Sequence, residues 1–251
     1  AKFIVAEIND QMPSLKNSLS IPYEKIDYVV NVSHPLVKFD SAAGATPDSF
    51  NKIGQHIADL IEDGDTFQIG IGKVPAAILS RLKDKRHLGI QGGMITDGGM
   101  ELHQAGVITG ARKTYEPSKI VVGMALGGEK LYKWAANTHD ILFRPATITH
   151  DVRIISQIEN FVSINSVLEV DLTGQANAEM LSSRQISGTG GLLDFVRGAR
   201  MSKNGRSILA LSSTAAHGKI SRIVFKLNNW PTVSCPRADT DYVVTEHGVA
   251  Q

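Results

Sequence analysis

The chain has 251 residues, 42% hydrophobic and 20% charged, enough for one large globular domain or two small ones. Its 26 basic and 25 acidic residues form no basic stripe with aromatics, which leaves a nucleic-acid partner without electrostatic support. Apolar runs such as 120–126 are too short to span a membrane. The single cysteine, Cys235, excludes an intramolecular disulfide and fits a reducing, cytoplasmic compartment.

The two ends of the chain carry a further expectation. The sequence begins without methionine, directly in the apolar run 3–8, and lacks the zones of a signal peptide. It stops after residues 245–251 without a polar tail. We therefore expect both ends to continue in a longer protein.

Short apolar runs alternate with helical patterns along the first part of the chain. Residues 47–62 place apolar side chains on one helical face, with Thr46 as the expected cap, Pro47 at the first position and Gly64 as the stop. Further helices are expected at about 75–82, about 98–105 and 129–136. Strands are expected at 3–8, 28–30, 66–71, 88–91 and 120–126.

The later part is richer in strands and glycines. Strands are expected at 161–164, 168–172, 208–211, 220–225 and 242–245. Strand-helix alternation predicts an α/β fold, an open sheet with flanking helices that is largely parallel at first and mixed in this later part.

One glycine motif, Gln-Ile-Gly-Ile-Gly-Lys-Val-Pro at 68–75, follows a predicted strand and opens a predicted helix. Glycines let a backbone approach a ligand closely, and free N–H groups at a helix start favour an anion such as a phosphate. The third glycine of a dinucleotide fingerprint is absent, and so is the Gly-Lys-Ser/Thr of a phosphate loop. A plain strand-to-helix turn has the same pattern.

A second glycine motif, Ser-Gly-Thr-Gly-Gly-Leu-Leu-Asp-Phe, occupies 187–195. Adjacent backbone N–H groups in such a run can form a nest that stabilises the oxyanion of acyl transfer. A flexible loop would also explain the glycine content.

A third motif, 92–101, contains Asp97 and Glu101 four residues apart. On a helix both carboxylates share one face and could serve as general acid and base. Acidic residues early in a helix more often complement its dipole.

Other kinds of site find little support. There is no Gly-x-Ser-x-Gly elbow, and the eight histidines form no His-x-x-x-His pair, so neither a serine hydrolase nor a metal site is expected. Cys235 precedes a proline in a turn-like segment, which favours an inert thiol. Glu169 and Asp171 alternate with apolar residues, as on the polar face of a strand.

Taken in order, these segments resemble the acetyl-CoA hydrolase/CoA-transferase family, near its 4-hydroxybutyrate CoA-transferase branch. The resemblance covers nearly the whole chain. The segments that carry it are 6–13, 33–36, 60–64, 70–75, 82–85, 87–90, 169–175, 188–198 and 241–246.

The resemblance implies a domain organisation. Family members have two related α/β halves with the active site between them. Residues 1–35 would be the end of the N-terminal half and 36–251 a truncated C-terminal half. A homo-oligomer, or a partner chain that supplies the missing half, is then expected.

The resemblance also implies a mechanism. In the family a glutamate attacks the acyl-CoA thioester and forms an anhydride, from which a glutamyl-CoA thioester arises and passes CoA to an acceptor acid. The place of that glutamate falls on Gly93, which has no side chain. A second departure is Leu192, where the family's glycine run usually continues with glutamine.

The resulting prediction is an enzyme that uses coenzyme A as a substrate, without a metal. Acyl-CoA and a small carboxylic acid are its expected partners, and it would be an acyl-CoA:carboxylate CoA-transferase or acyl-CoA hydrolase. A water-using hydrolase of a CoA ester and a non-catalytic acyl-CoA-binding subunit are the alternatives. The reaction centre is assigned to Gly93, Asp97 and the amides of Gly190 and Gly191, and CoA binding to Gly70, Gly72, Lys73, Pro75 and Gly188.

Overall fold

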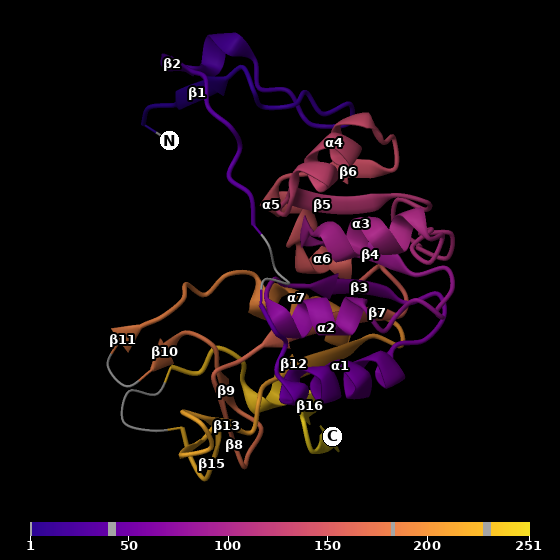
Figure 1. Cartoon of the computed structure of the whole chain (residues 1–251), viewed down its shortest axis with the longest axis vertical. Helices are drawn as coiled ribbons and strands as arrows, with labels where there is room; N and C mark the ends of the chain where they lie inside the picture. Colours follow the sequence, from indigo (N-terminus) through magenta and orange to yellow (C-terminus); the bar gives the residue numbers. More distant parts are fainter. Residues whose placement is uncertain (1, 40–43, 182–183, 228–231) are drawn as a thin grey trace.

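The centre of the molecule is an eight-stranded sheet in the order β17-β16-β12-β7-β3-β4-β5-β6 (Figure 1). The computed structural model describes residues 2–39, 44–181, 184–227 and 232–251. The strands are β3 (Thr66–Ile69), β4 (Gly89–Ile95), β5 (Ile120–Ala125), β6 (Ile141–Phe143), β7 (Phe161–Ser166), β12 (Arg206–Ala210), β16 (Tyr242–Thr245) and β17 (Gly248–Ala250). All neighbours are parallel except β16 and β17, which confirms the predicted α/β sheet with mixed pairing late in the chain.

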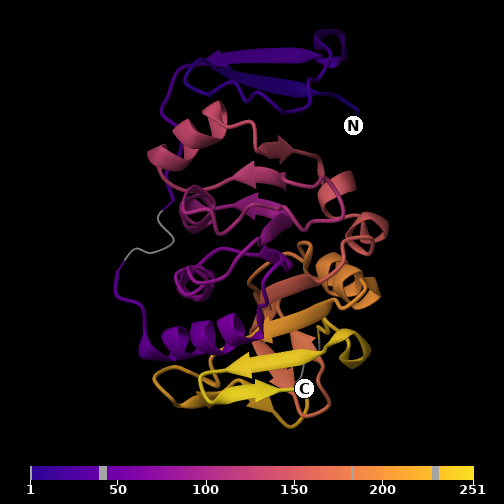
Figure 2. The ribbon, with the colours of Figure 1, turned by 90° about the vertical axis from the view of Figure 1, so that its right-hand side faces the viewer.

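Helices cover both faces of this sheet, as Figure 2 shows. One face carries α1 (Asp48–Leu60), α2 (Lys73–Leu79), α3 (Asp97–Gln104) and α4 (Glu129–Asn137), and the other α5 (Ala146–Thr149), α6 (Val152–Ile155) and α7 (Leu192–Met201). Because parallel strands are buried on both sides, they form continuous apolar runs. All four residues of β3 are buried, and Phe67 at its centre is fully enclosed by the main core. None of the helices in the described ranges is long and apolar enough to cross a bilayer.

The direction of the chain reverses at the middle of the sheet. From β3 the strands proceed through β4 and β5 to β6, after which β7 returns to pair with the other edge of β3. The helix that follows β3 and the helix that follows β7 lie on opposite faces (Figure 2). In open α/β sheets the carboxyl ends of two such strands flank a crevice, and ligands bind there. The fold therefore points to the ends of β3 and β7.

Smaller sheets flank the main one. The strands β1 (Val5–Asn9) and β2 (Tyr28–Val32) form a separate parallel pair at one end of the molecule (Figure 1). The remaining elements are β8 (Glu169–Asp171) with β9 (Ala176–Asn177) and β15 (Ile223–Val224), the hairpins β10 (Met180–Leu181)–β11 (Arg184–Gln185) and β13 (Thr214–Ala215)–β14 (Ile220–Ser221), and the 3₁₀ turns η1 (Tyr23–Lys25) and η2 (Arg237–Asp239).

Several predicted boundaries were wrong. Pro47, not Thr46, is the N-cap of α1. The strand expected at 66–71 ends at Ile69, because the glycines that follow it form a turn. The strand expected at 88–91 continues to Ile95 and includes Gly93. The short elements β6, α5 and α6, and the ten-residue helix α7 that follows the second glycine motif, were not predicted at all.

Candidate functional site

A groove of about 240 Å³ opens where the carboxyl ends of β3 and β7 lie side by side. The first glycine motif forms one wall, and the ends of β7 and β12 form the other. Its lining includes Ile71, Gly72, Lys73, Pro75, Ser166, Leu211, Ser212 and Arg222. Two of these side chains are cations, Lys73 and Arg222, so the groove suits an anionic ligand.

The glycine turn presents bare backbone toward this groove. Gly72, the N-cap of α2, has φ +112°, a conformation that L-residues rarely adopt. A Cβ added at Gly70 or Gly72 would meet no described atom within 4 Å. Lys73 begins α2, and its Nζ donates to the carbonyl oxygen of Ala45 at 3.0 Å. Pro75 is buried in the first turn of α2, where the missing N–H leaves no helical bond broken. The predicted binding residues of this motif therefore lie together.

The third glycine motif places Gly93 near the carboxyl end of β4, beside a histidine. A Cβ added at Gly93 would lie 3.3 Å from Cε1 and 3.4 Å from Nε2 of His150. The imidazole thus lies where a side chain of residue 93 would begin, and no carboxylate can be supplied from this position.

Contacts from two helices, α5 and α7, hold His150. His150 ends α5, and its backbone N–H donates to Ala146 at 2.9 Å. Its Nδ1 lies 2.8 Å from the hydroxyl of Thr149, which is fully buried. Its ring lies on Phe195 of α7, with 4.6 Å between ring centroids. Burial lowers the pKa of His150 below its ordinary value, against an opposing effect of the Asp194 carboxylate.

The second glycine motif also lies against the His150 ring. Gly191 is the N-cap of α7, and a Cβ there would lie 2.6 Å from Nε2 of His150. Gly190 has φ +54°, and a Cβ at Gly190 or Gly188 would meet no described atom within 4 Å. The structure therefore brings two predicted residues, Gly93 and Gly191, together around a histidine.

Asp97 is engaged elsewhere. It opens α3, and its Oδ2 accepts a hydrogen bond from the backbone N–H of Gly128 at 2.9 Å. It also shares a surface hollow with Glu101, as the four-residue spacing predicted. The contact with Gly128 fastens α3 to the loop before α4, so Asp97 has a structural task. Its role as a catalytic acid stays a prediction.

Two further residues considered in the sequence have structural surroundings. Although burial opposes ionisation of Asp171, hydrogen bonds from Thr173 and Gln175 hold its pKa below the ordinary value, and they shape the turn between β8 and β9. Cys235 is fully buried, and burial raises the pKa of its thiol. A thiol held protonated is a poor nucleophile.

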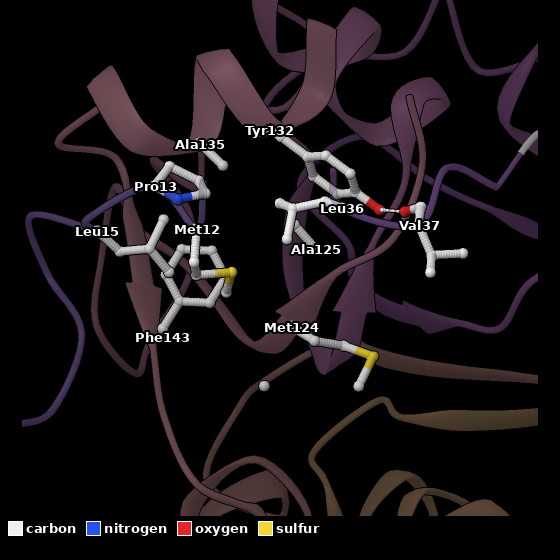
Figure 3. Close-up of a pocket in the computed structure, with 11 residues that line it drawn as sticks. Met12, Pro13, Leu15, Leu36, Val37, Met124, Ala125, Tyr132, Ala135 and Phe143 are labelled. Carbon is white, nitrogen blue, oxygen red and sulfur yellow. Dashed lines mark hydrogen bonds between the residues drawn. The ribbon is translucent and has the colours of Figure 1, made fainter. Parts of the chain in front are cut away.

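An apolar hollow of about 300 Å³ lies one strand away from Gly93, between the N-terminal segment and the β5–α4–β6 region (Figure 3). Its lining includes Met12, Leu15, Leu36, Met124, Ala135 and Phe143. Tyr132 closes one side by donating its hydroxyl proton to the carbonyl oxygen of Val37 at 2.8 Å. Gly123 also lines it, and a Cβ there would lie 3.0 Å from the carbonyl oxygen of Gly93. The hollow and the His150 cluster are therefore neighbours.

Sequence reasoning missed two residues of this region. His150 lies between Thr149 and Asp151 in a segment without periodicity, and it forms no spaced pair with another histidine. Gln91, on the same strand as Gly93, is fully buried, and neither atom of its amide has a partner among the described residues. A polar residue inside an otherwise apolar strand was the available signal for Gln91.

Known proteins share this architecture and sequence. Residues 127–251 match the profile of the acetyl-CoA hydrolase/transferase C-terminal domain. The 4-hydroxybutyrate coenzyme A transferase of Clostridium kluyveri is 44% identical over 250 residues, which are all of this chain and 58% of that protein. The crystal structure of RipA from Yersinia pestis is 37% identical with a TM-score of 0.90, and the alignment covers 100% of this chain and 56% of RipA.

A further solved structure is similar to this chain. The 4-hydroxybutyrate CoA-transferase of Porphyromonas gingivalis is 38% identical with a TM-score of 0.85, over 99% of this chain and 58% of that structure. This chain thus spans somewhat more than half the length of these relatives. As its motifs predicted, the chain belongs to the acetyl-CoA hydrolase/CoA-transferase family.

Proposed function

We propose that the protein cleaves acyl-CoA thioesters with water and forms no covalent carboxylate intermediate. The observation that carries the proposal is the pairing of Gly93 with His150. Position 93 of β4 has no side chain that could attack a thioester, and the imidazole of His150 lies beside it. An anhydride or a glutamyl-CoA ester cannot form on glycine, whereas water needs only space and a base.

The groove at the ends of β3 and β7 is where we place the CoA moiety. CoA carries phosphates, and Lys73 and Arg222 supply positive charge to the groove. Gly70 and Gly72 leave the backbone open to close approach. This location also coincides with the reversal point of the sheet, where ligands of open α/β folds bind.

The acyl group belongs, in this proposal, at the apolar hollow beside Gly123. The thioester carbonyl would then lie between Gly93 and the start of α7. The backbone N–H groups of Gly190 and Gly191 are the proposed oxyanion donors, because the first turn of a helix leaves its N–H groups without internal acceptors. Gly188, further out in the same loop, would contact the CoA arm.

The names of the relatives support chemistry on CoA esters. They leave two reactions to consider, hydrolysis by water and transfer of CoA to a carboxylate. Some are CoA-transferases, among them butyryl-CoA:acetate CoA-transferase of Anaerostipes caccae, 36% identical, and others are acetyl-CoA hydrolases, such as that of Neurospora crassa, 29% identical. Transfer to a carboxylate is therefore the second candidate. The absence of a carboxylate at Gly93 favours water.

We extend the proposal to the organisation of the protein. Residues 1–35 would close an N-terminal half and residues 36–251 would form most of a C-terminal half, with the active site completed by the rest of the protein or by another copy. Support comes from the separate β1–β2 sheet and from the share of each relative that the chain spans.

The test uses the full-length protein with a panel of short acyl-CoA esters, with and without a carboxylate acceptor. We expect free CoA thiol and free acid in a 1:1 ratio, with a rate that does not depend on the acceptor. Borohydride reduction followed by peptide mass spectrometry should reveal no reduced glutamyl or aspartyl residue. Acceptor-dependent formation of a new CoA ester, or such an adduct, would contradict the proposal. Binding without turnover would contradict it as well and favour a non-catalytic subunit.

A further inference from the structure

The Nε2 atom of His150 faces two backbone positions that carry no side chain. It is 3.4 Å from the Cβ position of Gly93 and 2.6 Å from that of Gly191. These glycines belong to β4 and to the start of α7, elements far apart in sequence. With any other residue at either position, this nitrogen would be covered. The two glycines therefore leave this nitrogen without a covering side chain from either position.

The contacts of Thr149 favour one tautomer of this ring. The Thr149 hydroxyl lies 3.4 Å from the carbonyl oxygen of Pro145 and 2.8 Å from Nδ1 of His150. We assign its single proton to the Pro145 carbonyl, so that the hydroxyl oxygen accepts from Nδ1–H. With this assignment Nε2 is the unprotonated nitrogen. The chain from Pro145 through Thr149 to His150 holds the imidazole in the form of a base, as an orienting group does for a catalytic histidine.

We propose that Nε2 of His150 is the general base that activates water for attack on the thioester. This inference rests on the proposed function. Nε2 takes a proton from water as the water oxygen forms a bond to the thioester carbon. The oxyanion so formed collapses, the C–S bond breaks, and the departing thiolate receives the proton back from Nε2–H. Acyl-CoA and water become carboxylic acid and CoA thiol, with no net change at the histidine.

The surroundings of the ring support a base that works at neutral pH. Burial lowers the pKa of His150 below the ordinary value near 6.5, so the ring is neutral at pH 7. On α7 the Asp194 carboxylate opposes this shift. On α6 the Asp151 carboxylate is paired with Arg153. On β4, glycines and Met94 surround Gly93, so that strand places no charged group there.

The experiment removes the base and then returns it. In the full-length protein His150→Ala leaves a space bordered by two glycines, into which free imidazole can fit. We expect kcat for hydrolysis of a short acyl-CoA to fall at least about 100-fold, the usual contribution of a general base. Affinity for CoA, measured by calorimetry, should change less than about threefold, because the groove is untouched. Added imidazole should restore at least about a tenth of the lost rate.

Two comparisons sharpen the result. His150→Asn retains a donor to Thr149 without a base, so it should be as slow as His150→Ala while keeping the thermal stability of the wild type. The matched control is His103→Ala, which removes another half-buried histidine, packed against Trp134 on the opposite face of the sheet, and should leave kcat unchanged. The wild-type rate should rise with pH and level off below pH 7, an inflection that both His150 variants lose.

Each contrary result has a distinct meaning. If the wild type hydrolyses without a carboxylate adduct and His150→Ala keeps its kcat within threefold, or is slow but not rescued by imidazole, the inference fails and the proposed function stands. A trapped acyl-histidine would also overturn it, because the ring would then be a nucleophile. If the wild type transfers CoA through a reduced carboxylate adduct, the proposed function itself fails.

Discussion

Two glycine-rich regions of this molecule look alike in sequence and differ in what the glycines do. In the turn after β3, a Cβ at Gly70 or Gly72 would enter empty space, so glycine there uncovers the backbone. Around His150, a Cβ at Gly93 or Gly191 would meet the imidazole, so glycine there makes room for another side chain. The first arrangement suits a ligand that contacts main chain, and the second suits a reactive group that must stay uncovered.

The role of a glycine in each region follows from what an added Cβ would contact there. In this molecule the open positions at Gly70 and Gly72 belong to the turn that borders the groove, and the crowded positions at Gly93 and Gly191 border the His150 ring. Substitutions at these positions test the distinction.

Gly191→Ala should have the largest effect. Its Cβ would lie 2.6 Å from Nε2 of His150, so the ring must shift and its nitrogen is covered. We expect at least about a 100-fold loss of hydrolysis and a loss of roughly 1–3 kcal/mol in the free energy of unfolding, as for overpacked sites. Chemical denaturation and thiol release measure the two quantities. The double variant with His150→Ala should recover the stability, and a loss that persists in it would show that the ring is not the cause.

Gly93→Glu places a carboxylate at the position that the sequence resemblance assigns to the family's glutamate, but its Cβ would lie 3.3 Å from Cε1 of His150. The single variant should lose hydrolysis at least about tenfold without gaining transfer, because the ring blocks the new side chain. Gly93→Glu combined with His150→Ala should form a glutamyl-CoA adduct that borohydride traps. Mass spectrometry of the peptide that contains residue 93 is the measurement. Efficient transfer by the single variant would show that the imidazole leaves space for a carboxylate.

Lys113→Met tests a buried cation near a glycine of β4. A Cβ at Gly89 would lie 2.7 Å from the hydroxyl of Thr66 and 3.4 Å from the stem of Lys113, and Lys113 is 3% exposed. Burial lowers the pKa of Lys113 to about 7. Between pH 7 and the ordinary value near 10.5 the unfolded chain binds one more proton, so Lys113 makes stability rise with pH over this interval.

The effect of Lys113→Met on the free energy of unfolding should therefore depend on pH. The gain in stability of Lys113→Met over the wild type should be greater at pH 6 than at pH 9 by roughly 2–3 kcal/mol, from the differential protonation just described. Urea denaturation at both pH values is the measurement. The exposed Lys83→Met is the control and should leave the pH dependence unchanged. A lower stability of Lys113→Met at both pH values would contradict the assignment.

Gly70→Ala should have the smallest effect and concerns binding alone. Its Cβ would meet no described atom, and its backbone is outside the left-handed region, so the fold should tolerate it within about 0.5 kcal/mol. Affinity for CoA should fall roughly threefold to tenfold, because a methyl group intervenes between backbone and ligand. Gly72→Ala, at φ +112°, should instead lose roughly 1 kcal/mol of stability. Unchanged CoA affinity in Gly70→Ala would mean that the turn is structural only.

The alternating pattern was enough to predict the fold class and most central elements. Apolar spacing located α1, α3 and α4 to within a few residues, because each packs a single face on the sheet. The helix α7 also has apolar residues at Leu192, Phe195, Val196 and Ala199, a helical spacing. This helix was not predicted because the glycines at its start are typical of a loop. The elements β6, α5 and α6 are too short to show a period.

The site was predictable only in part, for a physical reason. Glycines can be found in a sequence, and three of the motifs that contain them do lie at the carboxyl edge of the sheet. Glycine, however, has no side chain, so its presence in a sequence does not indicate which residue packs against it. His150 is separated in sequence from both Gly93 and Gly191, so the packing of α5 against β4, and of Phe195 on α7 against the His150 ring, brings the three together.

The return of β7 to the edge of β3 has a consequence for folding. Thr66 pairs with Phe161, nearly a hundred residues later in the chain, so the groove between these strands closes only after a long loop has been ordered. Contacts of such high sequence separation slow folding, and parallel pairing adds to the delay. We therefore expect the groove, and with it ligand affinity, to form late in folding. Substitutions that hinder this late closure will lower the yield of binding-competent protein even when they lie far from the groove.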